Sequence, residues 1–272
     1  MNNLSIIIVN YNSGSILETL VDYLLQTLTT AEVILVDNNS SDRSADFSTQ
    51  LSSVRLISQA KNIGFGAAAN IGATAASRPI LLFLNPDCFP NDDAISEMAK
   101  VLESDNNAGL CGARLLDFNA KEQLGGRRRD PTFPLVIGKA FRQITGFDHI
   151  PSFDINRDPV PDSPTPVEAV SGACMMTTKK IHNDLAGFDE KFFLHFEDLD
   201  YCRRVRQLGY DVLFVPAAGV FHYQGVSGRS SALSIGRAKI DSFRHYASKY
   251  ALLPAPVITL VDKVLQSFLG LA

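Results

Sequence analysis

The first 36 residues constrain the fold most, because they pass from a strand pattern to a helix pattern and back. Residues 4–9 are rich in β-branched side chains and end at the polar segment 10–14, which predicts a buried strand followed by a turn. Apolar residues then recur at helical spacing over residues 16–28, and a second apolar run occupies residues 32–36. A strand, a helix and a strand this close together predict a right-handed βαβ unit with parallel strands.

The rest of the chain continues this alternation. We expect strands at residues 54–57, 80–84, 108–116, 167–177 and 212–215, and helices at residues 62–76, 92–103 (capped by Asn91 or Asp92) and 197–209. Residues 183–188 are typical of a turn. The predicted fold is therefore α/β, with a Rossmann-like, mostly parallel central sheet flanked by helices.

The strand at residues 80–84 is apolar at every position, which is typical of a strand covered on both faces. Asn85 and Pro86 end it, because proline has no N–H and restricts the residue before it. Asp87 is thus predicted to project at the carboxyl end of a central strand, where open α/β sheets bind ligands. Taken alone, however, the Asn-Pro-Asp sequence is better explained as a turn.

The chain has 272 residues, which suits one large α/β domain, placed here at residues 1–250. Its net charge of -4 argues against a nucleic acid as the main partner. The four cysteines form no C-x-x-C pair, so we expect reduced, buried thiols in a cytoplasmic protein. A secretory signal is not expected, and no segment approaches the roughly 20 apolar residues that span a bilayer.

Two segments lack apolar periodicity. Residues 125–131 form a basic turn with three consecutive arginines, and residues 151–166 contain five prolines. Such segments are either binding and lid loops or linkers between domains. We favour loops, because the apolar pattern at residues 167–177 continues the same predicted sheet.

Three carboxylates, Glu197, Asp198 and Asp200, crowd the start of the last predicted helix. Capping and the helix dipole explain acidic residues there, at about 0.3–1 kcal/mol each. Three acidic residues within four positions exceed what a cap requires, and an aromatic run precedes them. A desolvating wall beside a carboxylate is one way in which proteins tune a general base. The run contains Phe192, Phe193 and Phe196.

Seven short motifs, in this order, resemble those of the family 2 glycosyltransferases with a GT-A fold, and among them the rhamnosyltransferase-like members. They are IIIVNYN (6–12), VDNNSSD (36–42), NIGFGAAAN (62–70), LNPD (84–87), SGA (171–173), EDLD (197–200) and HYQGVS (222–227). The resemblance covers residues 4–250. It implies a nucleotide-sugar-binding half at residues 1–116 and an acceptor and catalytic half, with acceptor-side loops, at residues 117–250.

The resemblance also implies a donor site. Asp37 would accept the N3–H of uracil or thymine, and Tyr11 would contact the base or the ribose. Asp87 stands where the D-x-D motif of the family places its second aspartate, which binds Mg²⁺ or Mn²⁺ with the donor diphosphate. Asn85 replaces the first aspartate. A lone histidine after a strand is more often a packed residue than a ligand, but His222 matches the additional metal ligand of some relatives. The other implied donor-binding residues are Asn39, Asn62, Gly64, Asn70 and Asn85 itself.

For catalysis, the resemblance assigns the general base to Asp198, in one direct displacement that inverts the anomeric configuration. Gly172, Ala173, Glu197 and Asp200 would bind the acceptor, with the two acids also able to orient the base or cap the helix. Arg203 and Arg204 would hold phosphate or, as is commoner, pair with these carboxylates. The chain has no tryptophan, so the Q-x-x-R-W motif of processive relatives is absent and a single sugar addition is expected.

The leading donor implied by the subgroup is dTDP-rhamnose, with a UDP-sugar as the alternative. The acceptor would be a saccharide or lipid-linked saccharide in O-antigen or other surface polysaccharide assembly. Two other functions stay open: a sugar-phosphate nucleotidyltransferase, which would need a glycine-rich basic loop after the first strand, and a non-catalytic nucleotide-binding scaffold, which Asn85 alone favours.

Residues 251–272 predict a C-terminal amphipathic helix with a single lysine on its polar face. Packing on the domain or on a second subunit, in a homodimer, suits that composition better than a membrane surface. Basic residues lie just upstream, so peripheral association with the inner face of a membrane is a further hypothesis. They are Arg229, Arg237, Lys239, Arg244 and Lys249.

Overall fold

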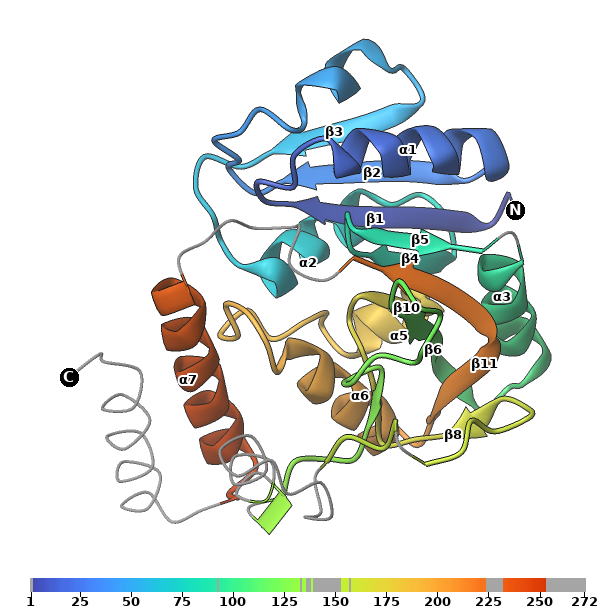
Figure 1. Cartoon of the computed structure of the whole chain (residues 1–272), viewed down its shortest axis with the longest axis vertical. Coiled ribbons are helices and arrows are strands. Elements are labelled where there is room, and N and C mark those ends of the chain that lie inside the picture. Colours follow the sequence, from blue (N-terminus) through green and yellow to red (C-terminus); the bar gives the residue numbers. More distant parts are fainter. Residues whose placement is uncertain are drawn as a thin grey trace.

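The computed structural model describes residues 2–132 except 92, residues 134, 135 and 138, residues 153–223 except 157, and residues 232–252. Its centre is a mixed sheet with the strand order β3-β2-β1-β4-β10-β6-β11-β5, and β8 pairs with β11 at its side (Figure 1). A separate short ribbon pairs β7 with β9. The fold is α/β, as predicted.

The first half of the sheet is parallel. It contains β1 (Leu4–Asn10), β2 (Glu32–Asp37), β3 (Val54–Ser58) and β4 (Ile80–Leu84). The helices α1 (Ile16–Thr27) and α2 (Phe65–Ala75) connect them, together with the 3-10 helix η1 (Asp46–Gln50). The predicted βαβ unit is confirmed, because β1 and β2 run parallel from Ser5 opposite Glu32 to Asn10 opposite Asp37.

The second half is mixed. Its strands are β5 (Cys88–Pro90), β6 (Ala108–Leu116), β8 (Thr165–Pro166), β10 (Cys174–Thr178) and β11 (Asp211–His222), with β7 (Arg127–Arg128) and β9 (Ala169–Val170) beside them. Its helices are α3 (Ala94–Ser104), α5 (Lys179–Asp184), α6 (Glu197–Gln207) and α7 (Ala232–Lys249). β10 is antiparallel to both β4 and β6, whereas β11 is parallel to β6.

Four predictions about this half are corrected. Residues 167–177 are not one strand, because β9 belongs to the ribbon with β7 and β10 to the main sheet. Between them the Ser171 N–H donates to the Gly126 carbonyl oxygen at 3.0 Å. The last strand extends through Pro216 to His222, and a register shift after Val215 accommodates the proline. Residues 179–184 form the helix α5, although a turn was predicted from residue 183. The helix α3 begins at Ala94 with Asp93 as its N-cap, whereas the predicted cap was Asn91 or Asp92.

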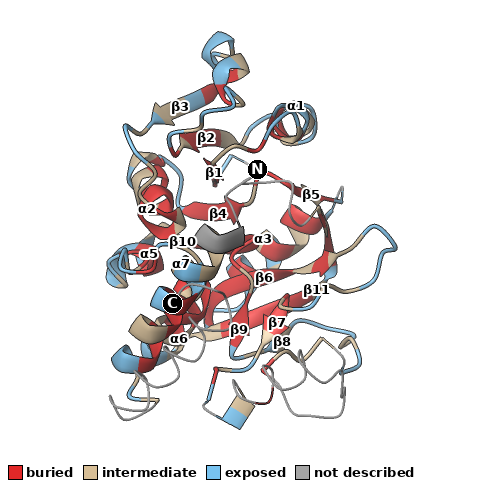
Figure 2. Cartoon of the chain, turned by 60° about the vertical axis from the view of Figure 1, so that its left-hand side comes forward, coloured by how far each residue is buried: buried red, intermediate tan, exposed pale blue. Residues whose placement is uncertain are grey.

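Alternate residues of the central strands face two apolar layers, and Figure 2 shows that these strands are mostly buried. One layer packs against α1 and α3, and the other packs against α2, α5, α6 and Tyr246 of α7. β4 has Leu82 and Leu84 in the first layer and Leu81 and Phe83 in the second. This confirms that β4 is covered on both faces, and each of these side chains contributes about 1.5–3 kcal/mol through burial.

The four cysteines are buried and form no disulfide bond, as predicted. Within the described part of the chain, none of the helices has the length and apolar character needed to cross a bilayer. The C-terminal helix predicted at residues 251–272 falls almost wholly on residues 253–272, which lie outside the described residues, as does Arg229.

Candidate active site

Asp87 and His222 lie together at the edge of the sheet. Asp87 follows β4 and is 1% exposed, while His222 ends β11 directly opposite Cys88 of β5. The His222 Nε2 atom is 3.4 Å from Asp87 Oδ1, and the ligand atoms of Asp87, Cys88 and His222 all lie within 4.8 Å of one another. Carboxylate oxygen and imidazole nitrogen are suitable ligands for Mn²⁺ or Mg²⁺.

Cys88 is the unexpected member of this group. Burial, and then the charge of Asp87, raise the pKa of its thiol well above the usual value. The neutral thiol is a weak ligand for a hard cation. Asp87 and His222 are therefore the side chains here that would hold such a cation. The structure brings together the two residues that were predicted as its ligands.

The second part of the site is the start of α6. The two residues before it, His195 and Phe196, both have left-handed backbone conformations, with φ of 68° and 67°. Such values are uncommon outside glycine, and consecutive pairs at a helix start indicate local strain. The resulting turn brings Glu197 and Asp198 into the first turn of α6 as buried side chains.

Asp198 is held by three donors. Its Oδ2 atom accepts hydrogen bonds from Arg128 Nη2 at 2.6 Å and from the Gly172 N–H at 3.0 Å, and its Oδ1 atom accepts from the Leu199 N–H at 2.8 Å. Burial acts to raise the pKa of Asp198, but the Arg128 charge and these hydrogen bonds together lower it below its usual value. Asp198 is therefore ionised and able to accept a proton.

Glu197 behaves in the opposite way. Burial, and then the charge of Asp198, raise its pKa to about 8, and its Oε2 atom is buried without a hydrogen-bond partner among the described residues. Desolvation thus raises the pKa of Glu197, whereas the pKa of Asp198 is lowered by its hydrogen-bond partners. Among the preceding aromatics, Phe192 and Phe196 pack against the rings of α7.

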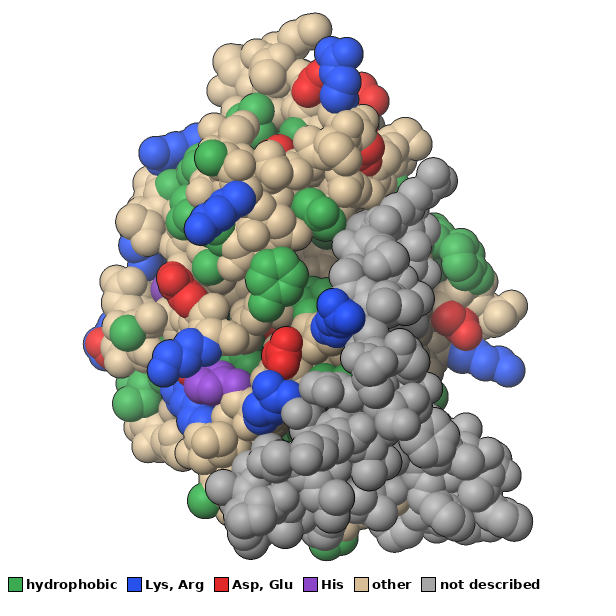
Figure 3. Space-filling model, turned by 90° about the vertical axis from the view of Figure 1, so that its left-hand side faces the viewer, with side chains coloured by type: hydrophobic (Ala, Val, Ile, Leu, Met, Phe, Trp, Pro, Cys, Tyr) green, Lys and Arg blue, Asp and Glu red, His purple; other side chains and the backbone are tan. Residues whose placement is uncertain are grey.

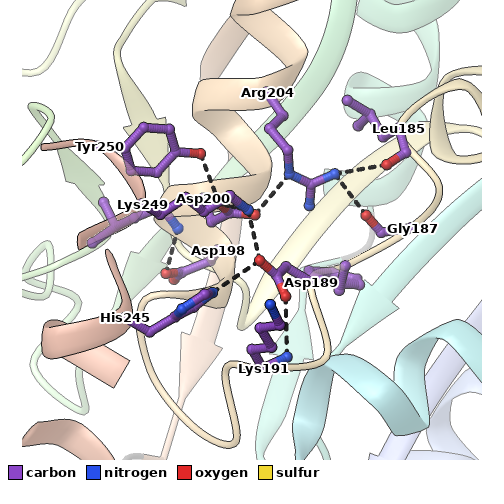
Figure 4. A network of polar contacts seen from close by, with 12 residues as sticks. Leu185, Gly187, Asp189, Lys191, Asp198, Asp200, Arg204, His245, Lys249 and Tyr250 are labelled. Carbon is purple, nitrogen blue, oxygen red and sulfur yellow. Dashed lines mark hydrogen bonds and ion pairs between the residues drawn. The ribbon is translucent and has the colours of Figure 1, made fainter. Parts of the chain in front are cut away.

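Asp200 points into a different network, shown in Figure 4. Its carboxylate is fully buried and accepts from Arg204 Nε at 2.7 Å and from the Tyr250 hydroxyl at 2.7 Å, while Lys249 Nζ lies 2.6 Å away. Lys249 and His245 also contact Asp189. The predicted pairing of Arg204 with an acid is confirmed, and the contacts of Asp200 favour tying α7 to α6 over binding an acceptor.

The predicted donor residues gather where β1 and β2 end. Asp37 Oδ1 accepts from Asn10 Nδ2 at 2.8 Å. Asn38, which is 2% exposed, donates to Asn62 Oδ1 at 2.9 Å and to the Gly64 carbonyl at 3.2 Å. Tyr11 beside them is half-buried and Asn39 is exposed. This corner therefore has a rigid polar frame, and sequence reasoning missed Asn10 and Asn38 in it.

The remaining predicted residues divide into two groups. The Asn85 N–H donates to the Ala173 carbonyl oxygen at 2.8 Å, and the neighbouring Gly172 N–H donates to Asp198 at 3.0 Å. Asn70 instead holds the loop before α6, because its side chain exchanges hydrogen bonds with the backbone of Phe188 at 2.8 and 3.0 Å.

A sequence profile of the family described as Glycosyl transferase family 2 matches residues 5–160, which is more than half of the chain. The chain belongs to glycosyltransferase family 2. A member of this family is a glycosyltransferase.

Two relatives of this glycosyltransferase are named as rhamnosyltransferases. The N-acetylglucosaminyl-diphospho-decaprenol L-rhamnosyltransferase of Mycobacterium tuberculosis is 26% identical over 271 aligned positions, which cover 92% of this chain and 83% of that protein. Rhamnosyltransferase WbbL of Escherichia coli is 29% identical over 210 positions, which cover 70% and 72% of the two chains.

Solved structures establish the fold of this glycosyltransferase as GT-A. GalNAc-T7 with UDP, GalNAc and Mn²⁺ superposes with a TM-score of 0.62 at 18% identity, covering 98% of this chain and 54% of the other. The mannosyltransferase PcManGT of Pyrobaculum calidifontis with GDP-Man and Mn²⁺ gives a TM-score of 0.61 at 14% identity, covering 99% and 70%.

Two residues that contact the candidate site were missed from the sequence. Arg128 lies in the predicted basic turn, but no local pattern shows that it reaches Asp198. Gln123 contacts His222 from the turn that follows β6.

Proposed function

We propose that this glycosyltransferase is an inverting, metal-dependent hexosyltransferase that transfers a single sugar from a pyrimidine nucleotide sugar. The leading donor is dTDP-rhamnose, followed by a UDP-sugar. The rhamnosyltransferase relatives support the sugar, and the position of Asp37 at the end of β2 supports a base whose N3–H needs an acceptor. The acceptor class, a saccharide or a diphosphate-linked saccharide lipid in surface polysaccharide assembly, follows the name of the mycobacterial relative.

The observation that carries the proposal is that Asp198 and Asp87 lie at the same end of two neighbouring strands. Asp198 bonds to Gly172, just before β10, and Cys174 of β10 lies opposite Leu84 of β4, which Asp87 follows. Asp198 takes the proton of the acceptor hydroxyl as that oxygen bonds to the anomeric carbon, and the bond to the donor phosphate breaks. The nucleoside diphosphate leaves with the electron pair. A divalent cation held by Asp87 and His222 would supply charge stabilisation to this leaving group.

Arg128 and the Gly172 N–H have a supporting role in this step. Both bond the same oxygen of Asp198, so they fix the carboxylate and keep it ionised until the hydroxyl arrives. Asn85 stands where a second carboxylate would add charge. The cation site therefore has one protein carboxylate, which makes its affinity depend on the donor phosphates.

The test is a transfer assay with purified protein, Mn²⁺ or Mg²⁺, and a panel of donors that includes dTDP-rhamnose, UDP-glucose and GDP-mannose. A diphosphate-linked N-acetylglucosaminyl lipid analogue serves as the acceptor. We expect transfer from a dTDP- or UDP-sugar, with one sugar added and the anomeric configuration inverted by NMR. Retention of configuration, transfer from GDP-mannose alone, or full activity in Asp198→Asn would contradict the proposal. No turnover of any donor would favour a non-catalytic scaffold.

Membrane association and dimerisation are separate parts of the proposal. On the face shown in Figure 3, basic and acidic side chains of the described residues are interspersed. In α7, Lys249 is engaged by Asp189 and Asp200 rather than presented alone. Sedimentation with anionic liposomes at low salt tests membrane association, and protein that stays unbound would contradict it.

Analytical ultracentrifugation tests dimerisation, and a monomer would contradict it.

A further inference from the structure

The imidazole ring of His222 has a partner on each nitrogen. Its Nε2 atom faces Asp87 Oδ1 at 3.4 Å, and its Nδ1 atom lies 2.9 Å from Gln123 Oε1. The His222 side chain is 9% exposed, so water has little access to it. The two neighbours therefore decide which nitrogen carries the proton in the neutral ring.

The orientation of the Gln123 amide is fixed by two other contacts. Its Nε2 atom donates to the His222 carbonyl oxygen at 2.6 Å and to the Leu116 carbonyl oxygen at 3.2 Å. Rotating the amide by half a turn would place Oε1 against these two carbonyl oxygens, neither of which can donate. The oxygen of Gln123 must therefore face the ring of His222, and it can only accept there.

The backbone around Gln123 holds this arrangement in place. The Gln123 N–H donates to the Leu115 carbonyl oxygen at 2.9 Å. The neighbouring Glu122 forms an ion pair with Arg127 at 2.7 Å, and both of these side chains are 5% exposed. Gln123 thus reaches His222 from a hairpin that a buried ion pair makes rigid.

We propose that Gln123 is a positioning residue that keeps the proton of neutral His222 on Nδ1, so that the Nε2 lone pair faces Asp87 and is available to a divalent cation. If Nε2 carried the proton, it would donate to the carboxylate and remove both ligand atoms from the cation. A hydrogen bond to the other ring nitrogen is the general way in which proteins select the tautomer of a metal-binding histidine. The binding of a cation at His222 rests on the proposed function, whereas the tautomer of its ring does not.

The direct test is long-range ¹H–¹⁵N NMR of the histidine rings of the metal-free protein, at a pH about two units above the usual histidine pKa. Asp87→Asn and His222→Gln provide the assignment of the His222 signals. We expect the Nδ1–H tautomer in the wild type. In Gln123→Met, which keeps the length of the side chain but accepts no hydrogen bond, we expect Nε2–H. The Nε2–H tautomer in the wild type overturns the proposal.

The second readout is Mn²⁺ affinity in the presence of dTDP or UDP, measured by calorimetry. Loss of an outer contact of this kind weakens metal binding by about 10–100-fold. We expect Gln123→Met to lose affinity in this range and to recover its turnover at saturating Mn²⁺. Gln50→Met, at an exposed glutamine, is the matched control. If Gln123→Met unfolds, Gln123→Glu is used, because its carboxylate still accepts from Nδ1 and should keep the Nδ1–H tautomer. Unchanged tautomer and affinity in Gln123→Met overturn the proposal, even if the protein proves to transfer no sugar.

Discussion

Arg128 and Asp198 form a buried ion pair, with Nη2 2.6 Å from Oδ2 although 70 residues separate them along the chain. Both side chains are 11% exposed, so water screens the pair weakly. The proposed base is thus not an isolated carboxylate in an apolar pocket. Its pKa is lowered chiefly by Arg128, which comes from the short ribbon outside the main sheet, and further by the Gly172 and Leu199 N–H groups.

Replacing Arg128 with methionine should shift the pH dependence of kcat/KM. Without the cation, burial raises the pKa of Asp198, so activity on the acidic side should fall at a higher pH than in the wild type. The uncompensated carboxylate should also cost about 3–5 kcal/mol of stability at neutral pH. Arg129→Met is the matched control, because Arg129 is 53% exposed and 3.8 Å from its partner Asp158. Superimposable acid limbs for Arg128→Met and wild type would count against this account.

Glu197 should make the stability of the protein depend on pH. Its pKa rises from 4.5 to about 8 on folding, so between these values the folded state holds a proton that the unfolded state has lost. The free energy of unfolding should therefore fall as pH rises from 4.5 to 8, by about 1.4 kcal/mol per pH unit at most. Glu197→Gln should remove most of this slope in urea titrations at a series of pH values. An unchanged slope would mean that Glu197 is ionised at neutral pH.

The carboxylate of Asp200 should be essential for the docking of α7. Asp200→Asn removes the buried counter-charge of Arg204 and one of the two acids that pair with Lys249, which should cost about 3–5 kcal/mol. Amide hydrogen exchange should show α7 losing protection first, because these contacts join it to α6. Asp241→Asn serves as the control, since Asp241 is 68% exposed and its ion pair with Arg244 is of the kind worth about 0–1 kcal/mol. Equal effects of the two variants would refute the docking role.

Gly64 should tolerate no side chain, for two separable reasons. Its φ is +88°, and a Cβ atom there would lie 2.6 Å from the Phe193 carbonyl oxygen. Backbone strain alone costs roughly 1 kcal/mol or more of stability. Gly64→Ala should cost more stability than this, because the clash adds to the strain. Gly125→Ala isolates the strain, because Gly125 has φ of +86° and no atom within 4 Å of the added Cβ. Thermal unfolding of both variants measures the difference, and equal losses would exclude the clash.

The parallel half of the fold was predictable because each of its strands and helices is a local pattern. β1, β2 and β4 are apolar runs, and α1 carries a clear helical stripe, so residues 4–84 follow from short windows of sequence. β5 could not be found in this way, because three residues become a strand only by pairing with the end of β11. The break between β9 and β10 depends likewise on contacts with Gly126 and Asp198.

The same distinction separates the two parts of the site. Asp87 and Asp198 stand in local motifs, so the resemblance could assign them. Arg128 and Gln123 act through contacts with residues 70 and 99 positions away, and nothing beside them in the sequence indicates those partners. Asp200 was grouped with its acidic neighbours, yet helical geometry turns its carboxylate toward Arg204, four residues on, and toward α7.

The most direct test of the central claim is thermal unfolding with dTDP, UDP, GDP and CDP, each with Mn²⁺, with Mg²⁺ and with chelator, in the wild type and in Asp87→Asn. A nucleotide at 100 times its dissociation constant adds about 2.7 kcal/mol to stability. We predict a shift with dTDP or UDP that requires a divalent cation and is lost in Asp87→Asn. No shift with any nucleotide, or an equal shift in chelator, would contradict it.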